Sequence, residues 1–399
     1  MGGRIKLGFL CPIPPDRIGL INYIKRFQEL SKSNLFDLYV LTNSRNFAPI
    51  NNVRMINIKG DLIFPLRLMS SIIHEKLEIL DIQYFYGLYG ELGKGSMRYL
   101  FSALNMFLIL LLSRIFNTST VLTMHSVIND ISKESIIDEI KSRNDLNFFL
   151  RLFNSMVGFF TDKVVVLSAF QFEEIRKYVN SSKIQMIPHG FDDKKPPEKK
   201  EHSGFTFLFF GLIRPNKGVL DLLISFDLLS NKYKSIKLII MGGLDHSSFK
   251  EYERYYTKVR KCIESMQSSG KIIDFREGWI DESVLTNALT VTDAIVLPYV
   301  DNANEVSGVA SQLAYAGIPF ILSDIPRFNS IFLDNFDCLF FPPKNTTVLA
   351  KKMEQIMINP NLRRRLGENL INKSVKFNWS YNAMEYAKIY QSLKNINIK

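Results

Sequence analysis

The residues that could bind a phosphate lie together in one loop, between Gly211 and Gly218. Arg214 and Lys217 supply two cations, and the two glycines let the backbone approach a bulky anion closely. A helical pattern follows Gly218, and the first turn of a helix offers unpaired N–H groups that favour an anion. The loop therefore predicts a phosphate-binding turn, although an ordinary strand-to-helix turn with solvated charges would have the same composition.

A second stretch, residues 299–319, places a carboxylate and small polar residues where a helix should begin. Glu305 precedes this helix, Gln312 lies one or two turns into it, and Gly317 is its expected end. We expect the first-turn amides to face the same crevice as the two cations, because ligands of parallel sheets bind at the carboxyl ends of the strands. That first turn comprises Ser307, Gly308 and Val309.

Two ring side chains also follow predicted strands. His125 comes directly after residues 119–124 and is a candidate contact to a substrate, with a purely structural histidine as the alternative. Trp279 follows Gly278, where it could shelter a nucleobase or pack in the core. The residues alone leave both alternatives open.

The elements that must position these residues alternate between strands and helices. Residues 205–210 form a continuous apolar run, which is typical of a strand covered on both faces. The pattern predicts an α/β protein with parallel sheets. The predicted strands are residues 5–10, 36–41, 53–58, 79–86, 119–124, 162–167 and 184–188 in the first half, and 205–210, 236–241, 271–275, 294–297 and 319–322 in the second.

The length of 399 residues exceeds what one hydrophobic core usually supports, so we expect two domains. Residues 194–204 are charged and contain prolines, which is the composition of a hinge. We predict an N-terminal domain over 1–195 and a C-terminal domain over 205–378. The last helix, 379–399, is amphipathic and should pack back on the first domain.

The net charge of +11 suits a nucleic acid, an anionic membrane surface or a phosphorylated small molecule. Three scattered cysteines indicate neither a disulfide framework nor a zinc site. Residues 99–113 are the most apolar stretch, but a membrane span needs about 20 apolar residues, so a buried or interfacial helix is expected. We expect a cytoplasmic protein that can contact the inner face of the cell membrane peripherally.

Four motifs in this order resemble those of the family 4 retaining glycosyltransferases. The likeness runs from Ile5 to the helix that begins at Trp379, and it implies the GT-B fold. In that fold two Rossmann-like, doubly wound domains face a central cleft, and the C-terminal helix returns to the N-terminal domain. The motifs are residues 187–192 (I-P-[NH]-G-[VF]-D), 210–218 (F-G-R-[IL]-x-x-x-K-G), 292–298 (A-D-[VI]-x-[VL]-x-P) and 316–319 (x-G-x-P).

The resemblance implies that Arg214 and Lys217 hold the diphosphate of the donor and that His125 approaches the sugar or the acceptor. Gly19 resembles the glycine of a first loop that closes on both substrates. The candidate catalytic residues are His125 and Glu305; the candidate donor-binding residues are Gly19, Gly211, Arg214, Lys217, Trp279, Asn304, Ser307, Gly308, Val309 and Gln312.

One departure concerns the E-x7-E pair of the family. Its second Glu, which binds ribose hydroxyls, aligns with Gln312, whose amide can still bond hydroxyls. Glu305 lies one residue short of the first Glu position, so Asn304 could occupy that place instead. Which of the two residues, Asn304 or Glu305, aligns with the first Glu of the family therefore stays open.

The implied activity is transfer of a hexose or N-acetylhexosamine from a nucleotide-sugar, such as a UDP-sugar or GDP-sugar, to a glycan that can be lipid-linked or part of a surface polymer. Because no Asp-x-Asp occurs near a strand end, we expect no metal and no other cofactor. Alternatives are a sugar-nucleotide epimerase of the same fold and a non-catalytic glycan- or nucleic-acid-binding protein. We expect neither a nucleic acid nor a protein partner.

Overall fold

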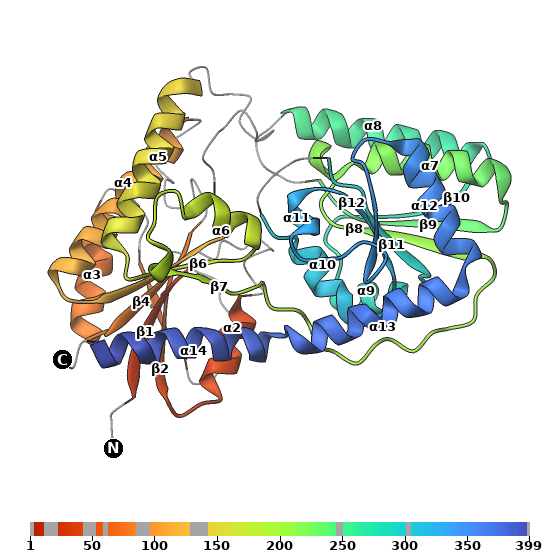
Figure 1. Ribbon diagram of the computed structural model, residues 1–399. Helices are drawn as coiled ribbons and strands as arrows, with labels where there is room; N and C mark the ends of the chain where they lie inside the picture. The colour runs from red at the N-terminus through yellow and green to blue at the C-terminus, as the bar shows by residue number, and fades with distance from the viewer. Residues whose placement is uncertain are drawn as a thin grey trace. The chain divides into compact units, whose positions relative to one another are not determined.

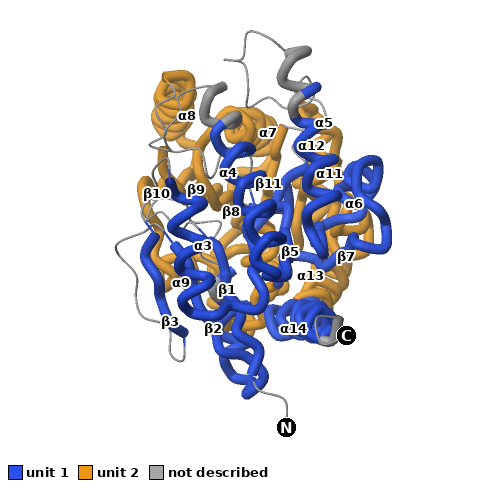
Figure 2. Tube along the Cα trace, turned by 90° about the vertical axis from the view of Figure 1, so that its left-hand side faces the viewer, with its two compact units in different colours: residues 1–190, 303–308, 377–399 blue, residues 191–302, 309–376 orange. Residues whose placement is uncertain are grey.

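The computed structural model describes residues 4–11, 23–42, 53–58, 63–84, 96–127, 143–244, 250–300 and 305–396 of the chain. The chain divides into two compact units, coloured separately in Figure 2. Unit 1 comprises residues 1–190, 303–308 and 377–399, and unit 2 comprises residues 191–302 and 309–376.

Unit 1 is built on a seven-stranded sheet in the order β3-β2-β1-β4-β5-β6-β7, in which each pairing is parallel. The strand order reverses between β1 and β4, as in a doubly wound fold. Its strands are β1 (Ile5–Leu10), β2 (Phe36–Thr42), β3 (Val53–Asn57), β4 (Ile79–Tyr84), β5 (Ser119–Met124), β6 (Lys163–Val166) and β7 (Ile184–Met186).

Helices cover the sheet of unit 1 (Figure 1). The helix α14 belongs to this unit although it is the last element of the chain, and it packs against α2. The return of the C-terminal helix, which is part of the predicted fold class, is therefore confirmed. The helices of unit 1 are α2 (Ile24–Ser31), α3 (Phe64–Glu75), α4 (Ser96–Ile115), α5 (Arg143–Phe160), α6 (Ala169–Ile175), the 3-10 turn η3 (Ser181–Lys183) and α14 (Trp379–Ile396).

Unit 2 contains a six-stranded sheet in the order β10-β9-β8-β11-β12-β13, again with parallel pairings. Here the order reverses between β8 and β11. The strand β13 was not predicted from the sequence, because its apolar run is only four residues long. The strands are β8 (Phe205–Phe210), β9 (Ile236–Gly242), β10 (Ile272–Glu277), β11 (Ala294–Leu297), β12 (Phe320–Ser323) and β13 (Cys338–Phe341).

The helices of unit 2 alternate with its strands, as the βαβ pattern requires (Figure 1). The helix α7 starts directly at the predicted phosphate loop and buries an apolar face that includes Leu222, Leu223 and Phe226. The helices are η4 (Pro215–Lys217), α7 (Val219–Lys232), α8 (Lys250–Ser268), α9 (Glu282–Thr290), α10 (Gly308–Leu313), η5 (Ala314–Ala316), α11 (Pro326–Asn329), α12 (Thr346–Ile358) and α13 (Pro360–Lys376); Gly308 itself falls in unit 1.

The apolar stretch of the first half forms α4, which packs between α3 and α5. Ala103, Met106, Ile109 and Leu110 are buried, as expected for a helix that covers a sheet. None of the described helices combines the length and the hydropathy that crossing a membrane would require.

Candidate functional site

The predicted phosphate loop lies at the reversal point of the unit 2 sheet, between the carboxyl ends of β8 and β11. Gly218 has φ 65° and ψ 25°, a left-handed conformation that favours glycine. A Cβ atom there would lie 1.8 Å from the carbonyl oxygen of Pro298, so the loop is pressed against the segment after β11. The amide of Val300 also donates to the carbonyl of Asn216 at 3.0 Å. Ligands of doubly wound sheets bind at such reversal points.

The loop after β9 packs against the phosphate loop at the same edge of the unit 2 sheet. Gly242 has φ 148°, and a Cβ atom on it would lie 1.9 Å from the carbonyl oxygen of Gly211. The amide of Gly211 in turn donates to the carbonyl of Met241 at 3.0 Å. The edge is therefore built of closely packed backbone, which fixes the position of the phosphate loop.

Three cations gather at the ends of β8 and β12. The Nζ atom of Lys217 lies 3.7 Å from the ring centroid of Tyr299, and the guanidinium of Arg327 lies 5.7 Å from that same centroid. Arg214 lies 5.6 Å from the ring centroid of Tyr252. Tyr299 is only 1% exposed, so its ring is a rigid support for two of these cations. This edge is suited to a diphosphate.

Arg327 was not predicted. It is buried in α11, four residues after the end of β12. The signal available in the sequence was an Arg directly after Pro326, beyond a predicted strand at the edge where ligands bind.

The predicted helix after Glu305 is shorter than expected. The α-helical part, α10, has six residues, and the 3-10 turn η5 continues it to Gly317, whose left-handed φ of 64° ends it. Val309 lies beside the phosphate loop, because a Cβ atom on Gly211 would meet its Cγ2 atom at 3.7 Å. Gln312 is half-buried in α10.

Along the sequence, the boundary between unit 1 and unit 2 falls within the segment that was predicted to bind the donor. Glu305, Ser307 and Gly308 belong to unit 1, whereas Val309 and Gln312 belong to unit 2. Ser307 is buried and Glu305 is half-buried. Gly19 and Asn304 lie outside the described residues, so the register of the loop stays open.

Trp279 lies in the loop after β10 and is 63% exposed. Packing in the core, one of the two alternatives for this residue, is therefore wrong, and its contact with a nucleobase stays a prediction. In the part of the chain that the structure describes, no three His, Cys, Asp or Glu side chains are grouped as a metal ion would need.

His125 lies in unit 1, directly after β5, and is 3% exposed. Its amide donates to the carbonyl of Tyr84 at 3.0 Å, and its carbonyl accepts from Nε2 of Gln171 at 3.0 Å. Its ring atom Nε2 lies 2.9 Å from Oε1 of Gln83. Burial lowers the pKa of His125 well below its usual range, and the charges of His189 and Arg26 add to this effect. The imidazole is therefore neutral at neutral pH.

A fully buried ion pair joins α2 to β4. Nη2 of Arg26 lies 3.2 Å from Oδ2 of Asp81, and neither side chain is exposed. The guanidinium also lies 3.7 Å from the ring centroid of Tyr386. This pair was not predicted from the sequence. The available signal was Asp81 and Gln83, two polar residues at alternate positions of an otherwise apolar strand.

Comparison with known proteins connects the second half of the chain to one family. The family model described as "Glycosyl transferases group 1" matches residues 190–373. An uncharacterized glycosyltransferase of Methanocaldococcus jannaschii is 24% identical over 274 residues, which are 64% of this chain and 65% of that protein. The match thus spans slightly less than two thirds of the length of this curated relative.

Solved structures share the fold over nearly the whole chain. Sucrose-phosphate synthase from Thermosynechococcus elongatus has a TM-score of 0.74 and 16% identity, covering 98% of this chain and 100% of that one. A glycosyltransferase from Rickettsia africae has a TM-score of 0.70 and 14% identity, covering 98% of both chains. Anabaena HepE in complex with UDP-glucose has a TM-score of 0.70 and 12% identity, covering 98% of this chain and 100% of that one.

Proposed function

We propose that this chain transfers a hexose or N-acetylhexosamine from a nucleotide-sugar to an acceptor glycan. The predicted GT-B fold and the match of residues 190–373 to the glycosyl transferases group 1 family support this proposal. The observation that carries the proposal is the loop with Arg214 and Lys217, which lies at the reversal point of the unit 2 sheet within the residues that match the family. The complex of HepE with UDP-glucose supports a UDP-sugar as the first donor to test.

In the proposed reaction the bond between the sugar and the diphosphate breaks, and negative charge develops on the departing diphosphate. Lys217, Arg214 and the N-terminus of α7 are fixed before the reaction, so they can stabilise this charge without reorganising. The proposed contacts to the transferred sugar are Glu305 and His125. We propose a retaining reaction in which the acceptor attacks the same face of the sugar within an ion pair.

Donor binding tests this proposal most directly. A panel of UDP-, GDP- and ADP-sugars should contain at least one that raises the Tm of the protein, because a ligand that binds only the folded state stabilises it by mass action. The stabilising donor should then release its nucleoside diphosphate in the presence of an acceptor glycan. Conversion of the donor to an epimer without any acceptor would instead support an epimerase.

Removal of either loop cation should weaken donor binding. We expect Lys217→Met and Arg214→Met each to raise the Kd for the nucleoside diphosphate by roughly 10- to 150-fold, because a lost charged hydrogen bond costs about 1.5–3 kcal/mol. Titration calorimetry measures this change. The control is Lys232→Met at the far end of α7, which removes an exposed lysine paired with Glu354 and should leave Kd unchanged. Wild-type affinity in both loop variants would exclude this loop from the donor site.

Turnover should also survive an excess of EDTA, because we propose that protein cations and the α7 N-terminus neutralise the diphosphate. The measurement is the initial rate of diphosphate release after dialysis against the chelator. Loss of this rate, with recovery on adding Mg²⁺ or Mn²⁺, would show that a metal takes part.

We also propose peripheral contact with an anionic membrane through an apolar face of α5, defined by Phe148, Leu152 and Phe159. Their spacing of four and seven residues places them on one side of α5, and Phe148 and Phe159 are 70% and 65% exposed. Arg151 of α5 is exposed, and so is Arg114 of α4, whose guanidinium lies 5.6 Å from the ring centroid of Phe159; both can attract anionic lipids. Such contact would bring the enzyme to a lipid-linked acceptor.

Sedimentation with vesicles tests this contact. We expect the protein to bind vesicles of phosphatidylcholine mixed with phosphatidylglycerol more strongly than vesicles of phosphatidylcholine alone, and the double variant Phe148→Ser/Phe159→Ser to lose this binding. Ile358→Ser, which removes an exposed apolar residue from α12 of unit 2, should bind as the wild type does. Equal binding of all three proteins would exclude the apolar face of α5 as the membrane contact.

A further inference from the structure

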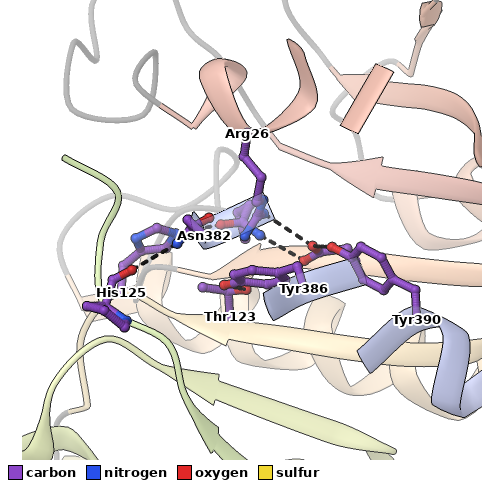
Figure 3. A network of polar contacts seen from close by, with 9 residues as sticks. Arg26, Thr123, His125, Asn382, Tyr386 and Tyr390 are labelled. Atoms are coloured by element: carbon purple, nitrogen blue, oxygen red, sulfur yellow. Dashed lines mark hydrogen bonds and ion pairs between the residues drawn. The ribbon is translucent and has the colours of Figure 1, made fainter. Parts of the chain in front are cut away.

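A chain of buried hydrogen bonds leads from the C-terminal helix to the ring of His125 (Figure 3). The hydroxyl of Tyr390 in α14 donates to Oδ2 of Asp81, and Arg26 contacts the same oxygen. Nε2 of Gln83 donates to Oδ1 of Asp81 at 2.8 Å, and Oε1 of Gln83 lies 2.9 Å from Nε2 of His125. The side chain of Gln83 thus connects the carboxylate with the imidazole.

The chemistry of this chain leaves only one arrangement of protons. A carboxylate beside Arg26 is ionised and can only accept hydrogen bonds, so Gln83 must turn its NH₂ group toward Asp81. The carbonyl oxygen of Gln83 then faces His125 and can only accept. Nε2 of His125 must therefore carry the proton, and in the neutral ring Nδ1 carries none and can only accept.

We propose that Gln83 is a positioning residue for the transfer reaction: held by Asp81, it fixes His125 as the tautomer protonated on Nε2, in which Nδ1 is the ring atom that can accept a hydrogen bond. This inference rests on the proposed function, in which His125 contacts the transferred sugar or the acceptor. Through Tyr390, the last helix of the chain contributes to the same arrangement.

The backbone and the neighbouring ring restrict His125 as well. Tyr84 and Gln171 hold its amide and its carbonyl, and the ring of Tyr23 lies edge-on with its centroid 4.4 Å away. These contacts fix the position of the ring, but none of them selects a tautomer. The bond to Gln83 does select one, because the oxygen of Gln83 can only accept from a ring nitrogen that carries a proton.

A spectroscopic experiment tests the tautomer without any substrate. The two-bond ¹⁵N–¹H spectrum of the histidine rings, with the His125 signals assigned by their loss in His125→Asn, should show the proton on Nε2 in the wild type. Gln83→Met fills the same volume but offers no acceptor, and it should give a tautomer mixture or the form protonated on Nδ1. The matched control is Thr120→Val, which removes a side-chain bond to Asp162 at the other end of β5 and should leave the His125 signals unchanged.

A wild-type ring protonated on Nδ1, or an unchanged tautomer in Gln83→Met, would overturn the inference. The wild-type spectrum needs no variant, so the test remains decisive even if Gln83→Met does not fold. In the turnover assay, Gln83→Met should lower kcat by about 10- to 100-fold with little change in donor KM, because a misplaced contact acts on the reacting geometry. Thr120→Val should keep a kcat near that of the wild type.

The two measurements separate this inference from the proposed function. If the tautomer changes in Gln83→Met while kcat stays at the wild-type value, Gln83 does not position a group for the reaction. If no donor or acceptor is turned over by the wild type while the tautomer behaves as expected, the proposed function fails and the assignment of the His125 ring still stands.

Discussion

Replacing Asp81 by Asn is expected to lower the free energy of unfolding of unit 1 by about 3–5 kcal/mol, because removing one partner of a buried ion pair leaves the other charge uncompensated. Arg26 and Asp81 are both fully buried, and the hydroxyl of Tyr390 also depends on this carboxylate. Burial raises the pKa of Asp81, whereas Arg26 and the hydrogen bond from Tyr390 favour its ionised form. The stacked ring of Tyr386 cannot replace the lost charge.

Urea denaturation followed by tryptophan fluorescence measures this loss for unit 1 alone. The chain has two tryptophans, of which Trp379 is buried in unit 1 and Trp279 belongs to unit 2, so the measurement is made in a Trp279→Phe background. The control is Asp37→Asn, which breaks the exposed pair with Arg4 and should cost no more than about 1 kcal/mol. A similar loss in both variants would show that the buried pair has no special role.

Glu305→Gln is expected to lower kcat by about 10²- to 10³-fold while the Kd for the donor changes little. The proposed role of Glu305 is to stabilise positive charge that develops on the sugar only as its bond to the diphosphate breaks, so the interaction is gained in the transition state. Gln312→Ala should instead raise KM, because a ribose contact is equally strong in the ground state and the transition state. The measurement is the steady-state rate of nucleoside diphosphate release at saturating and limiting donor.

Asn304→Ala resolves the register of this loop. If Asn304 holds the first Glu position of the family, Asn304→Ala should show the loss of kcat and Glu305→Gln should remain active. Wild-type kcat in Glu305→Gln would therefore remove Glu305 from the proposed catalytic residues, although the fold and the family would be unaffected.

The sequence by itself determined the features that depend on neighbouring residues. The apolar run before Gly211 and the helical pattern after Gly218 predicted β8 and α7 almost to the residue, because hydrophobic periodicity is a local property. The order of such elements predicted an α/β protein with parallel sheets, the resemblance implied two doubly wound domains, and this fold class is confirmed. The motifs around the phosphate loop predicted a likeness to the glycosyl transferases group 1 family, whose model matches residues 190–373, whereas the finer assignment to family 4 stays a prediction.

Only the tertiary structure decided which distant residues meet. Tyr390 and Asp81 are 309 positions apart, and Arg26 and Asp81 are 55 apart, so no sequence window contains either contact. Lys217 and Arg327 likewise share the ring of Tyr299 only because β8, β11 and β12 are neighbours in the sheet. A charge in an apolar strand shows from sequence that a partner must exist, since an unpaired buried charge is too costly. The identity of the partner follows from the packing of helices on the sheet, which local patterns do not encode.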